Sequence, residues 1–373
     1  MNFLRIRELV RKEFIQLFRD KKNRPILVIA PLVQLLVFGY VVSTDVRTIS
    51  VGIVDESRTP ESRKLVDAFN GNATFNVVFA DTDSRRLERE LLHRRLDLAL
   101  KIPPDFAELI KRRETASVQI LVDGSMSNMA SVRIAYASFV LDRFNRDLIA
   151  ELHPFTLEYG TVDGRFRTWY NPNLYSQNYF VPGIVAFLIM LLTLLFTSMA
   201  IIKEKEAGTM EQLMVTPLKS WELIAGKTIP YIIIAMSQMI VVTIFAVFWF
   251  RIPFAGSILL LFFSTCLFLL STLGMGLFIS TIAATQQQAM MTTFFVILPV
   301  FMLSGFVFPI ANMPQFVQWI TLLNPLRYFL VIIRGIFLKG VGFYVLWNQL
   351  FALTVIGIIV FAGSVMRFRK RLD

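Results

Sequence analysis

Hydrophobic positions are gathered into six long apolar runs, and polar segments of very unequal length separate them. The runs cover residues 26–42, 180–202, 229–250, 257–282, 289–308 and 345–365, and none contains Asp, Glu, Lys or Arg. A helix needs about 20 apolar residues to cross the hydrocarbon core of a membrane. The pattern therefore predicts an α-helical polytopic membrane protein with six transmembrane helices, rather than a soluble protein with buried helices.

The polar segment between the first two runs has the pattern of a folded α/β domain. Strand-like stretches at 50–54, 72–80, 96–102 and 117–122 alternate with helix-like stretches at 59–69, 83–95, 105–113 and 128–152. We expect an inserted extracytoplasmic α/β domain between the first and second transmembrane helices. The acidic pairs Asp55-Glu56 and Asp81-x-Asp83 follow predicted strands, and we expect them to cap helices rather than to act as an acid and a base.

The N-terminal residues 3–18 predict an amphipathic helix, because apolar side chains recur on one face at helical spacing. These apolar residues are Phe3, Ile6, Val10, Phe14 and Leu17. Arg5, Lys12 and Arg19 are expected to point away from that face. A basic amphipathic helix beside a membrane span typically lies in the interface plane, and the alternative is a helix packed on a protein partner.

These patterns define four segments. Residues 1–24 form a cytoplasmic amphipathic interfacial helix, and 25–43 the first transmembrane helix. Residues 44–178 form the extracytoplasmic domain. Residues 179–373 hold transmembrane helices two to six, a cytoplasmic loop at 203–220 and an extracytoplasmic segment at 309–343. That last segment is amphiphilic, and its apolar part, 326–337, is too short to span, so we expect it to re-enter the membrane from outside.

The net charge of +11 does not indicate a nucleic-acid partner, because the excess lies at the chain ends and in short loops. Residues 44–178 hold 18 Lys and Arg against 19 Asp and Glu. Basic residues flanking membrane helices stay on the cytoplasmic side, so both termini are expected in the cytoplasm. Cys266 is the single cysteine of the chain, so an intrachain disulfide is excluded, and it lies in an apolar run.

Several kinds of chemistry are absent from the sequence. No P-loop motif occurs, so the chain is not expected to hydrolyse nucleotide. His93 and His153 have no neighbouring cysteine, and no metal site, catalytic residue or cofactor site is predicted. The six runs lack the titratable residues that ion-coupled carriers keep in their spans. Energy for any transport must then come from a cytoplasmic partner.

The loop at 203–220 has the features of a docking element for such a partner. Gly208-Thr209 is expected to end one helix and cap another, and Thr216-Pro217 to stop the second after one or two turns. Ser220 would begin the next span. Leu213 could then enter a groove on the partner, whereas the alternative is an ordinary connecting loop.

Three motifs in this chain resemble those of ABC type-2 permeases, the membrane subunits of ATP-driven exporters. They are Glu204-x-Glu206-x-Gly208-Thr209-x-Glu211-x-Leu213-x-x-Thr216-Pro217, then Trp169-Tyr170-Asn171-Pro172 with Tyr179-x-Val181-Pro182-Gly183, and Asn324-Pro325-Leu326-Arg327-Tyr328. The resemblance covers the whole chain. The large outer domain resembles that of the multidrug-efflux-like branch.

The resemblance implies a permease subunit, not an enzyme by itself, that exports hydrophobic or amphiphilic, drug-like or lipid-like compounds. It implies a bacterial plasma (inner) membrane location, a second permease in a homo- or heterodimer, and a cytoplasmic ABC ATPase dimer that binds ATP and Mg. A periplasmic adaptor is a further candidate partner, and the sequence does not show whether the outer domain binds one. The implied coupling residues are Glu204, Glu206, Gly208, Thr209, Glu211, Leu213, Thr216 and Pro217. The substrate is not indicated. The alternative is a non-transporting membrane scaffold or signalling protein whose outer domain recruits an extracytoplasmic partner.

Overall fold

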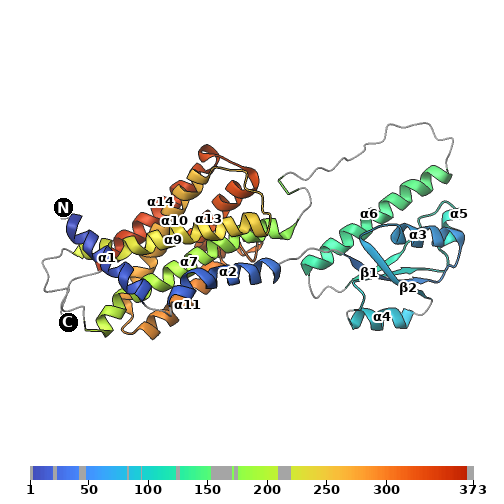
Figure 1. Ribbon diagram of the computed structural model, residues 1–373. Helices are drawn as coiled ribbons and strands as arrows, with labels where there is room; N and C mark the ends of the chain where they lie inside the picture. The colour runs from blue at the N-terminus through green and yellow to red at the C-terminus, as the bar shows by residue number, and fades with distance from the viewer. Residues whose placement is uncertain are drawn as a thin grey trace. The chain divides into compact units, whose positions relative to one another are not determined.

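A computed structural model describes residues 3–19, 23–41, 48–81, 84–93, 95–122, 127–152, 170–171, 175–208 and 220–367. The chain divides into two compact units, drawn in Figure 1. One unit comprises residues 1–43 and 167–373, and the other comprises residues 44–166. Each is described here by itself.

The first unit is a bundle of helices. Its long elements are α1 (Phe3–Arg19), α2 (Asn23–Val41), α7 (Ser176–Glu206), α9 (Ser220–Trp249), α10 (Ile258–Ile282), α11 (Gln286–Met302) and α14 (Phe343–Arg367). Among the described residues, four helices, α7, α9, α10 and α14, are long and apolar enough to cross a membrane. The chain is therefore a polytopic membrane protein.

The remaining apolar helices of the bundle are shorter or bent. Helix α12 (Gln315–Thr321) and the segment Pro325–Lys339 meet at 80° and would make a fifth span only if they act as one broken helix. The apolar part of α2, Ile29–Val41, is shorter than the 18 residues asked of a span, and α11 has 17 residues. The number of six spans thus stays a prediction.

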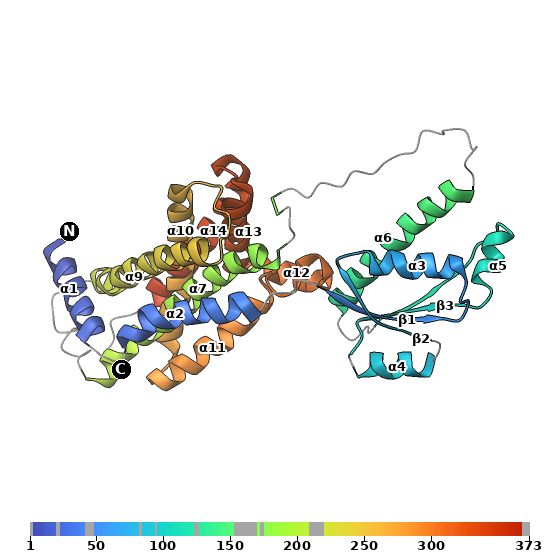
Figure 2. The same ribbon diagram turned by 45° about the vertical axis from the view of Figure 1, so that its right-hand side comes forward.

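Helix α7 is the central element of the bundle. It packs against α2, α9, α10, α11 and α13 (Pro325–Arg334), and most of its residues from Val181 to Ile202 are buried. In Figures 1 and 2 it runs between the other long helices. Any force applied to one end of α7 therefore reaches most of the bundle.

Helices α10 and α14 pack closely because glycine lies at their contact. A Cβ added at Gly274 would lie 2.8 Å from the backbone nitrogen of Phe361. Ser364 Oγ donates a hydrogen bond of 2.7 Å to the carbonyl of Gly274. Small residues and interhelical hydrogen bonds are the usual means of joining helices in a membrane, where lipid removes most of the hydrophobic driving force.

The second unit is a four-stranded sheet covered on both faces. Its strands β1 (Ile49–Asp55), β2 (Phe75–Asp81), β3 (Leu98–Ile102) and β4 (Gln119–Val122) lie in the order β2-β1-β3-β4. Strand β1 is parallel to β2 and β3, and β4 is antiparallel to β3. Helices α3 (Pro60–Asn70), α5 (Phe106–Lys111) and α6 (Ser127–Leu152) share a core with one face. Helix α4 (Ser84–Leu92) covers the other (Figure 2).

Asp55 closes the turn from β1 into α3. One carboxylate oxygen accepts the backbone N–H groups of Ser57 and Arg58, each at 3.0 Å. The other oxygen accepts Ser62 Oγ at 2.7 Å. The N-cap of α3 is Thr59, not the acidic pair that was expected to cap it, and Thr59 and Ser62 form a capping box in front of Pro60. The Asp55 carboxylate thus supports the turn that leads to the cap.

Candidate coupling site

Helix α7 continues into the predicted loop at 203–220 and ends just before Gly208, the residue expected to break it. Its last helical residue is Glu206, and Gly208 takes the left-handed backbone conformation with φ of 70°. Only glycine adopts that conformation without strain, which is why it commonly ends helices. Helix α9 begins at Ser220. The predicted coupling residues Thr209, Glu211, Leu213, Thr216 and Pro217 lie outside the described residues.

Glu204 and Glu206 point to different neighbours, because residues two apart lie on nearly opposite sides of a helix. Glu206 is exposed and reaches the first residue of α11. Its Oε1 accepts the backbone N–H of Gln286 at 2.8 Å, and its Oε2 accepts the side-chain amide of Gln286. A carboxylate at the N-terminus of a helix is electrostatically favoured. The end of α7 is therefore fixed to the start of α11.

Glu204 is only 2% exposed and belongs to a buried group of charges. Its Oε1 lies 3.0 Å from Lys12 Nζ and 3.2 Å from Lys227 Nζ. Lys227 Nζ also donates to Glu13 Oε1 at 2.9 Å and to the carbonyl of Ala200 at 3.2 Å. We call Lys12, Glu13, Glu204 and Lys227 the ion cluster. It joins α1, α7 and α9 at the two ends of the coupling loop.

The sequence did not single out Glu13 or Lys227 as site residues. It predicted that Lys12 points away from the apolar face of α1, and in the structure the Lys12 side chain, 46% exposed, reaches Glu204. Glu13 is buried at 5% exposure, because Lys227 requires a carboxylate partner inside the bundle. A signal was present: residues 6, 10, 13 and 17 share one helical face.

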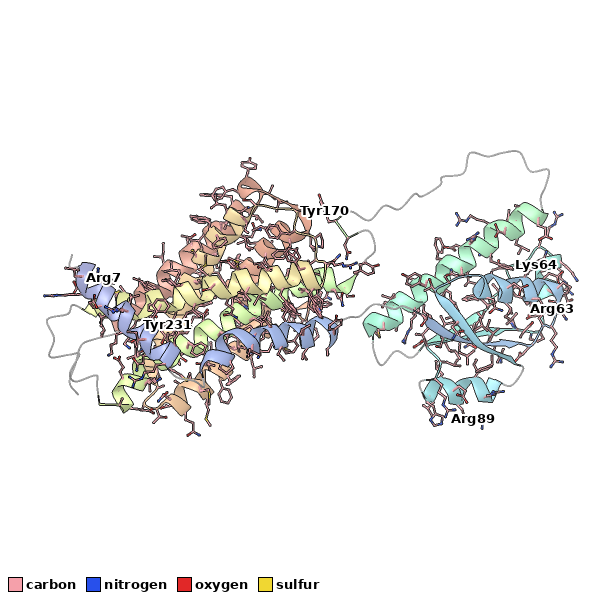
Figure 3. The ribbon with its side chains drawn as sticks, viewed as in Figure 1. Arg7, Arg63, Lys64, Arg89, Tyr170 and Tyr231 are labelled. Carbon is pink, nitrogen blue, oxygen red and sulfur yellow. The ribbon has the colours of Figure 1, made fainter. Side chains whose placement is uncertain are left out.

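Helix α1 packs on the N-terminal part of α9. A Cβ added at Gly226 would lie 2.7 Å from Leu9 Cβ. Tyr231, labelled in Figure 3, lies one turn along α9 from Lys227 and is buried. Arg7 points away from the bundle in the same view. Leu4 and Ile15 remain more than half exposed, so α1 has one face on the protein and another open to its surroundings.

The second motif meets α13, the helix that begins within the third motif, at the opposite end of α7. The guanidinium carbon of Arg334 in α13 lies 3.7 Å from the ring centroid of Tyr179. Arg334 Nε also donates to the carbonyl of Tyr179 at 3.3 Å. A Cβ added at Gly183 would lie 2.5 Å from the ring of Phe306 and 3.2 Å from Leu330. Glycine at this position thus allows the close approach of α13 to α7.

Each of these motifs also holds its own local structure. Asn171 Oδ1 accepts the backbone N–H of Tyr175 at 3.2 Å and the side chain of Asn178 at 2.9 Å. Trp169 and Pro172 lie outside the described residues.

In the third motif, Asn324 caps α13 and donates to the carbonyl of Val300 at 2.6 Å. Arg327 donates to Thr321 Oγ1, and Tyr328 donates to the carbonyl of Leu322 at 2.9 Å. These bonds hold the bend between α12 and α13.

The sequence was compared with known families and with curated proteins. The model of the ABC-2 family transporter protein matches residues 25–366. The probable multidrug ABC transporter permease YbhS of Escherichia coli K12 is 34% identical over 380 residues, covering 100% of this chain and 99% of the relative. The probable multidrug ABC transporter permease YbhR of the same strain is 32% identical over 370 residues, covering 99% of this chain and 100% of the relative.

The inner membrane transport permease YhhJ of E. coli K12 is 27% identical over 366 residues, covering 97% of this chain and 96% of the relative. The family match spans all the long helices described above except α1. The chain belongs to the ABC-2 transporter family and is a membrane permease subunit, in which ATP hydrolysis is the task of a separate subunit.

Proposed function

We propose that this chain is the permease of an exporter that moves hydrophobic or amphiphilic compounds out of the cytoplasm or the inner leaflet. An ATPase dimer would drive it by docking on the loop at 203–220. The observation that carries the proposal is the convergence of α1, α9 and α11 on the last turn of α7, beside Glu204 and Glu206. A loop anchored in this way transmits a push to the bundle instead of yielding to it.

The charge distribution supports a cytoplasmic position for this end of the bundle. Arg367 at the end of α14 lies 5.3 Å from the ring of Phe278 near the end of α10, so the last helix finishes beside the α10–α11 turn. The basic residues near this end include Arg5, Arg7, Arg11, Lys12, Arg19, Lys203, Lys205, Lys227 and Arg367. By the positive-inside rule this end is cytoplasmic. Both termini on one side require an even number of spans, and six includes α2 and α11.

The opposite end of the bundle carries features typical of the other interface. Trp249 Nε1 donates to Tyr40 Oη at 3.1 Å, and aromatic residues of this kind favour the water–lipid boundary. Gln177 donates to the carbonyl of Gly39 at 3.4 Å, so the chain leaves the bundle after Val41 and re-enters it at a neighbouring point. The α/β unit and the segment at 309–343 would then be extracytoplasmic.

The coupling region would comprise Glu204, Glu206, Gly208, Thr209, Glu211, Leu213, Thr216 and Pro217. In this proposal Glu211 and Leu213 contact the ATPase, while Glu204 and Glu206 hold the loop to the bundle. Tyr179 and Glu204 both lie in α7, and the 25 helical steps between them, at 1.5 Å each, span roughly 38 Å. Closure of the ATPases would thus act through α7 on the contact with Arg334.

The same proposal includes a second permease and an inner-membrane location. The outer unit would bind a periplasmic adaptor. ATP and Mg would be held by the ATPase.

The composition of the helices favours bulky apolar cargo. Ser198 and Thr293 are buried and bond to each other at 2.9 Å, and Thr193 donates to the carbonyl of Ile189 at 2.6 Å. The hydroxyls of these three residues are therefore engaged within the protein. The names of two relatives, each a probable multidrug permease, agree with this cargo class.

The test is ATP-dependent efflux of a hydrophobic fluorescent dye from proteoliposomes holding the permease and its ATPase. We expect dye movement with ATP and none with a hydrolysis-deficient ATPase. If the complex hydrolyses ATP but moves neither dye nor a labelled lipid, the proposal fails. The result would then favour the non-transporting scaffold.

A further inference from the structure

The ion cluster divides its charges evenly between α1 and the rest of the bundle. Lys12 and Glu13 are consecutive residues of α1, whereas Glu204 belongs to α7 and Lys227 to α9. The contacts cross between the two sides, because Lys12 meets Glu204 and Glu13 meets Lys227. Each side contributes one positive and one negative charge, so the cluster as a whole is neutral.

Lys227 is the centre of the cluster. Its ammonium group lies within 3.2 Å of Glu13, Glu204 and the carbonyl of Ala200. Lys227 and Glu13 are nearly inaccessible to solvent, at 3% and 5% exposure. Lys227 thus contacts an oxygen on α1 and two oxygens on α7 from its own position on α9.

Stability alone does not account for charges buried in this way. Desolvation of a buried ion pair costs several kcal/mol per ion, and apolar side chains of the same volume are often as stabilising. The charges instead determine the register of α1 on α9. Apolar side chains such as Leu9 and Leu17 could pack in several registers, whereas the crossed ion pairs allow one. The cluster therefore fixes the position of α1 on the helices that flank the coupling loop.

We infer that Lys227 is a positioning residue that locks α1 to both ends of the coupling loop, so that α1, the end of α7 and the start of α9 move as one rigid body. The inference deepens the proposed function and rests on it. In this arrangement a push on the loop turns α1 together with the bundle. Without the lock, α1 would move separately from α7 and α9, which stay packed on each other, and part of each stroke would be lost.

The charge balance of the cluster provides a test that separates positioning from folding. Lys227→Met alone leaves Glu13 and Glu204 opposite only Lys12, so the buried charge becomes unbalanced and the variant is expected to be unstable. Glu13→Gln combined with Lys227→Met restores neutrality and retains the pair of Lys12 and Glu204. The double variant should therefore recover thermal stability without the link between α1 and α9.

The measurements are thermal unfolding, ATPase rate and dye transported per ATP hydrolysed, on the full complex in proteoliposomes. For the double variant we expect near wild-type unfolding but a drop of about fivefold or more in transport per ATP, the lower end of typical coupling between sites. Recovery of both stability and transport would overturn the inference. The matched control is Lys64→Met with Glu151→Gln, an exposed ion pair of 2.6 Å in the α/β unit, which should leave both unchanged.

A covalent lock gives a second, independent measurement. In a Cys266→Ser background, Leu9→Cys and Gly226→Cys place two thiols at the contact between α1 and α9. A Cβ at Gly226 would lie 2.7 Å from Leu9 Cβ, closer than the roughly 3.8 Å of a disulfide, so the reduced double-cysteine protein is the control for the small shift of the helices that Gly226→Cys itself requires. Oxidation should leave transport per ATP unchanged, because the helices already move together. Loss of transport on oxidation and its return on reduction would show that α1 separates from α9, which contradicts the inference. Transport by the wild-type complex is measured beside both tests, so failure of the proposed function itself is recognised separately.

Discussion

Arg334 in α13 covers the ring of Tyr179 at the start of α7, with its guanidinium carbon 3.7 Å from the ring centroid. The same side chain donates to the backbone of Tyr179. One arginine therefore links α13 to the central helix through both the ring and the main chain.

Replacing Arg334 with Leu should destabilise the protein, because the cation–π contact and the hydrogen bond are lost together. We expect a loss of about 2 kcal/mol, the size of a desolvated cation–π contact. Arg334→Lys should be intermediate, since lysine keeps the charge but not the planar group that stacks on a ring. Thermal unfolding in detergent measures both, and equal stability of the wild type and the leucine variant would contradict the expectation.

Glu204→Gln and Glu206→Gln should differ in their effects although they lie on the same turn of α7. Glu204→Gln removes a buried negative charge between Lys12 and Lys227, and breaking such a group costs about 3–5 kcal/mol. Glu206→Gln keeps most of its hydrogen-bonding capacity at an exposed site, where water screens the charge, so we expect a much smaller loss of stability. Unfolding midpoints of the two variants, measured side by side, test the difference, and similar losses would count against it.

Gly274→Leu should separate α10 from α14. The added side chain meets the backbone of Phe361, and overpacking a tight contact typically costs about 1–3 kcal/mol. Gly363→Leu in α14 is the matched control, because an added Cβ there has no atom within 4 Å. Expression level and monodispersity on size exclusion report the effect, and an unaffected Gly274 variant would show that the helices can move apart freely.

Glu211→Lys together with Leu213→Lys should prevent the ATPase from docking while leaving membrane insertion intact. The double change reverses one charge and removes one apolar contact from the proposed coupling region. Co-purification of the ATPase and its stimulation by the permease are the measurements. A control double change, Leu92→Lys with Glu114→Lys at exposed positions of the α/β unit, should leave both unaffected. Normal co-purification of the coupling variant would mean that the docking site is elsewhere.

Labelling of single cysteines tests the orientation. In a Cys266→Ser background, Thr209→Cys should react with an impermeant maleimide only from the cytoplasmic side. Leu92→Cys, at a position that is 81% exposed, should react only from outside. Reaction of both from the same side would reject the proposed topology.

The fold followed from the sequence wherever local chemistry determines it. Thr59 and Pro60 predicted the start of α3, and Gly208 predicted the end of α7, because capping and left-handed backbone depend on neighbouring residues. The run at 289–308 predicted the ends of α11 less accurately, because hydrophobicity alone does not determine where a helix begins and ends. Thr285 caps α11 three residues earlier than expected, and Gly305, with φ of 84°, follows its end.

The candidate site was predictable only in part. The motif pointed to Glu204 and Glu206, but their opposite directions depend on which helices pack on each side of α7. Glu13 and Lys227 are 214 residues apart in the chain, and no local pattern joins them. An acidic residue within an apolar face indicates a buried partner, but only the packing of α1 on α9 identifies which lysine it is.

The close fit of α14 into the groove at Gly274 has a consequence for biogenesis. Because α14 follows α10 along the chain, α10 enters the bilayer before its partner does. Until α14 arrives, the surface of α10 around Gly274 faces lipid, and Ser364 has yet to bond to the carbonyl of Gly274. This close contact therefore forms late in assembly, and a chain truncated before α14 would leave α10 without the helix that its glycine surface fits.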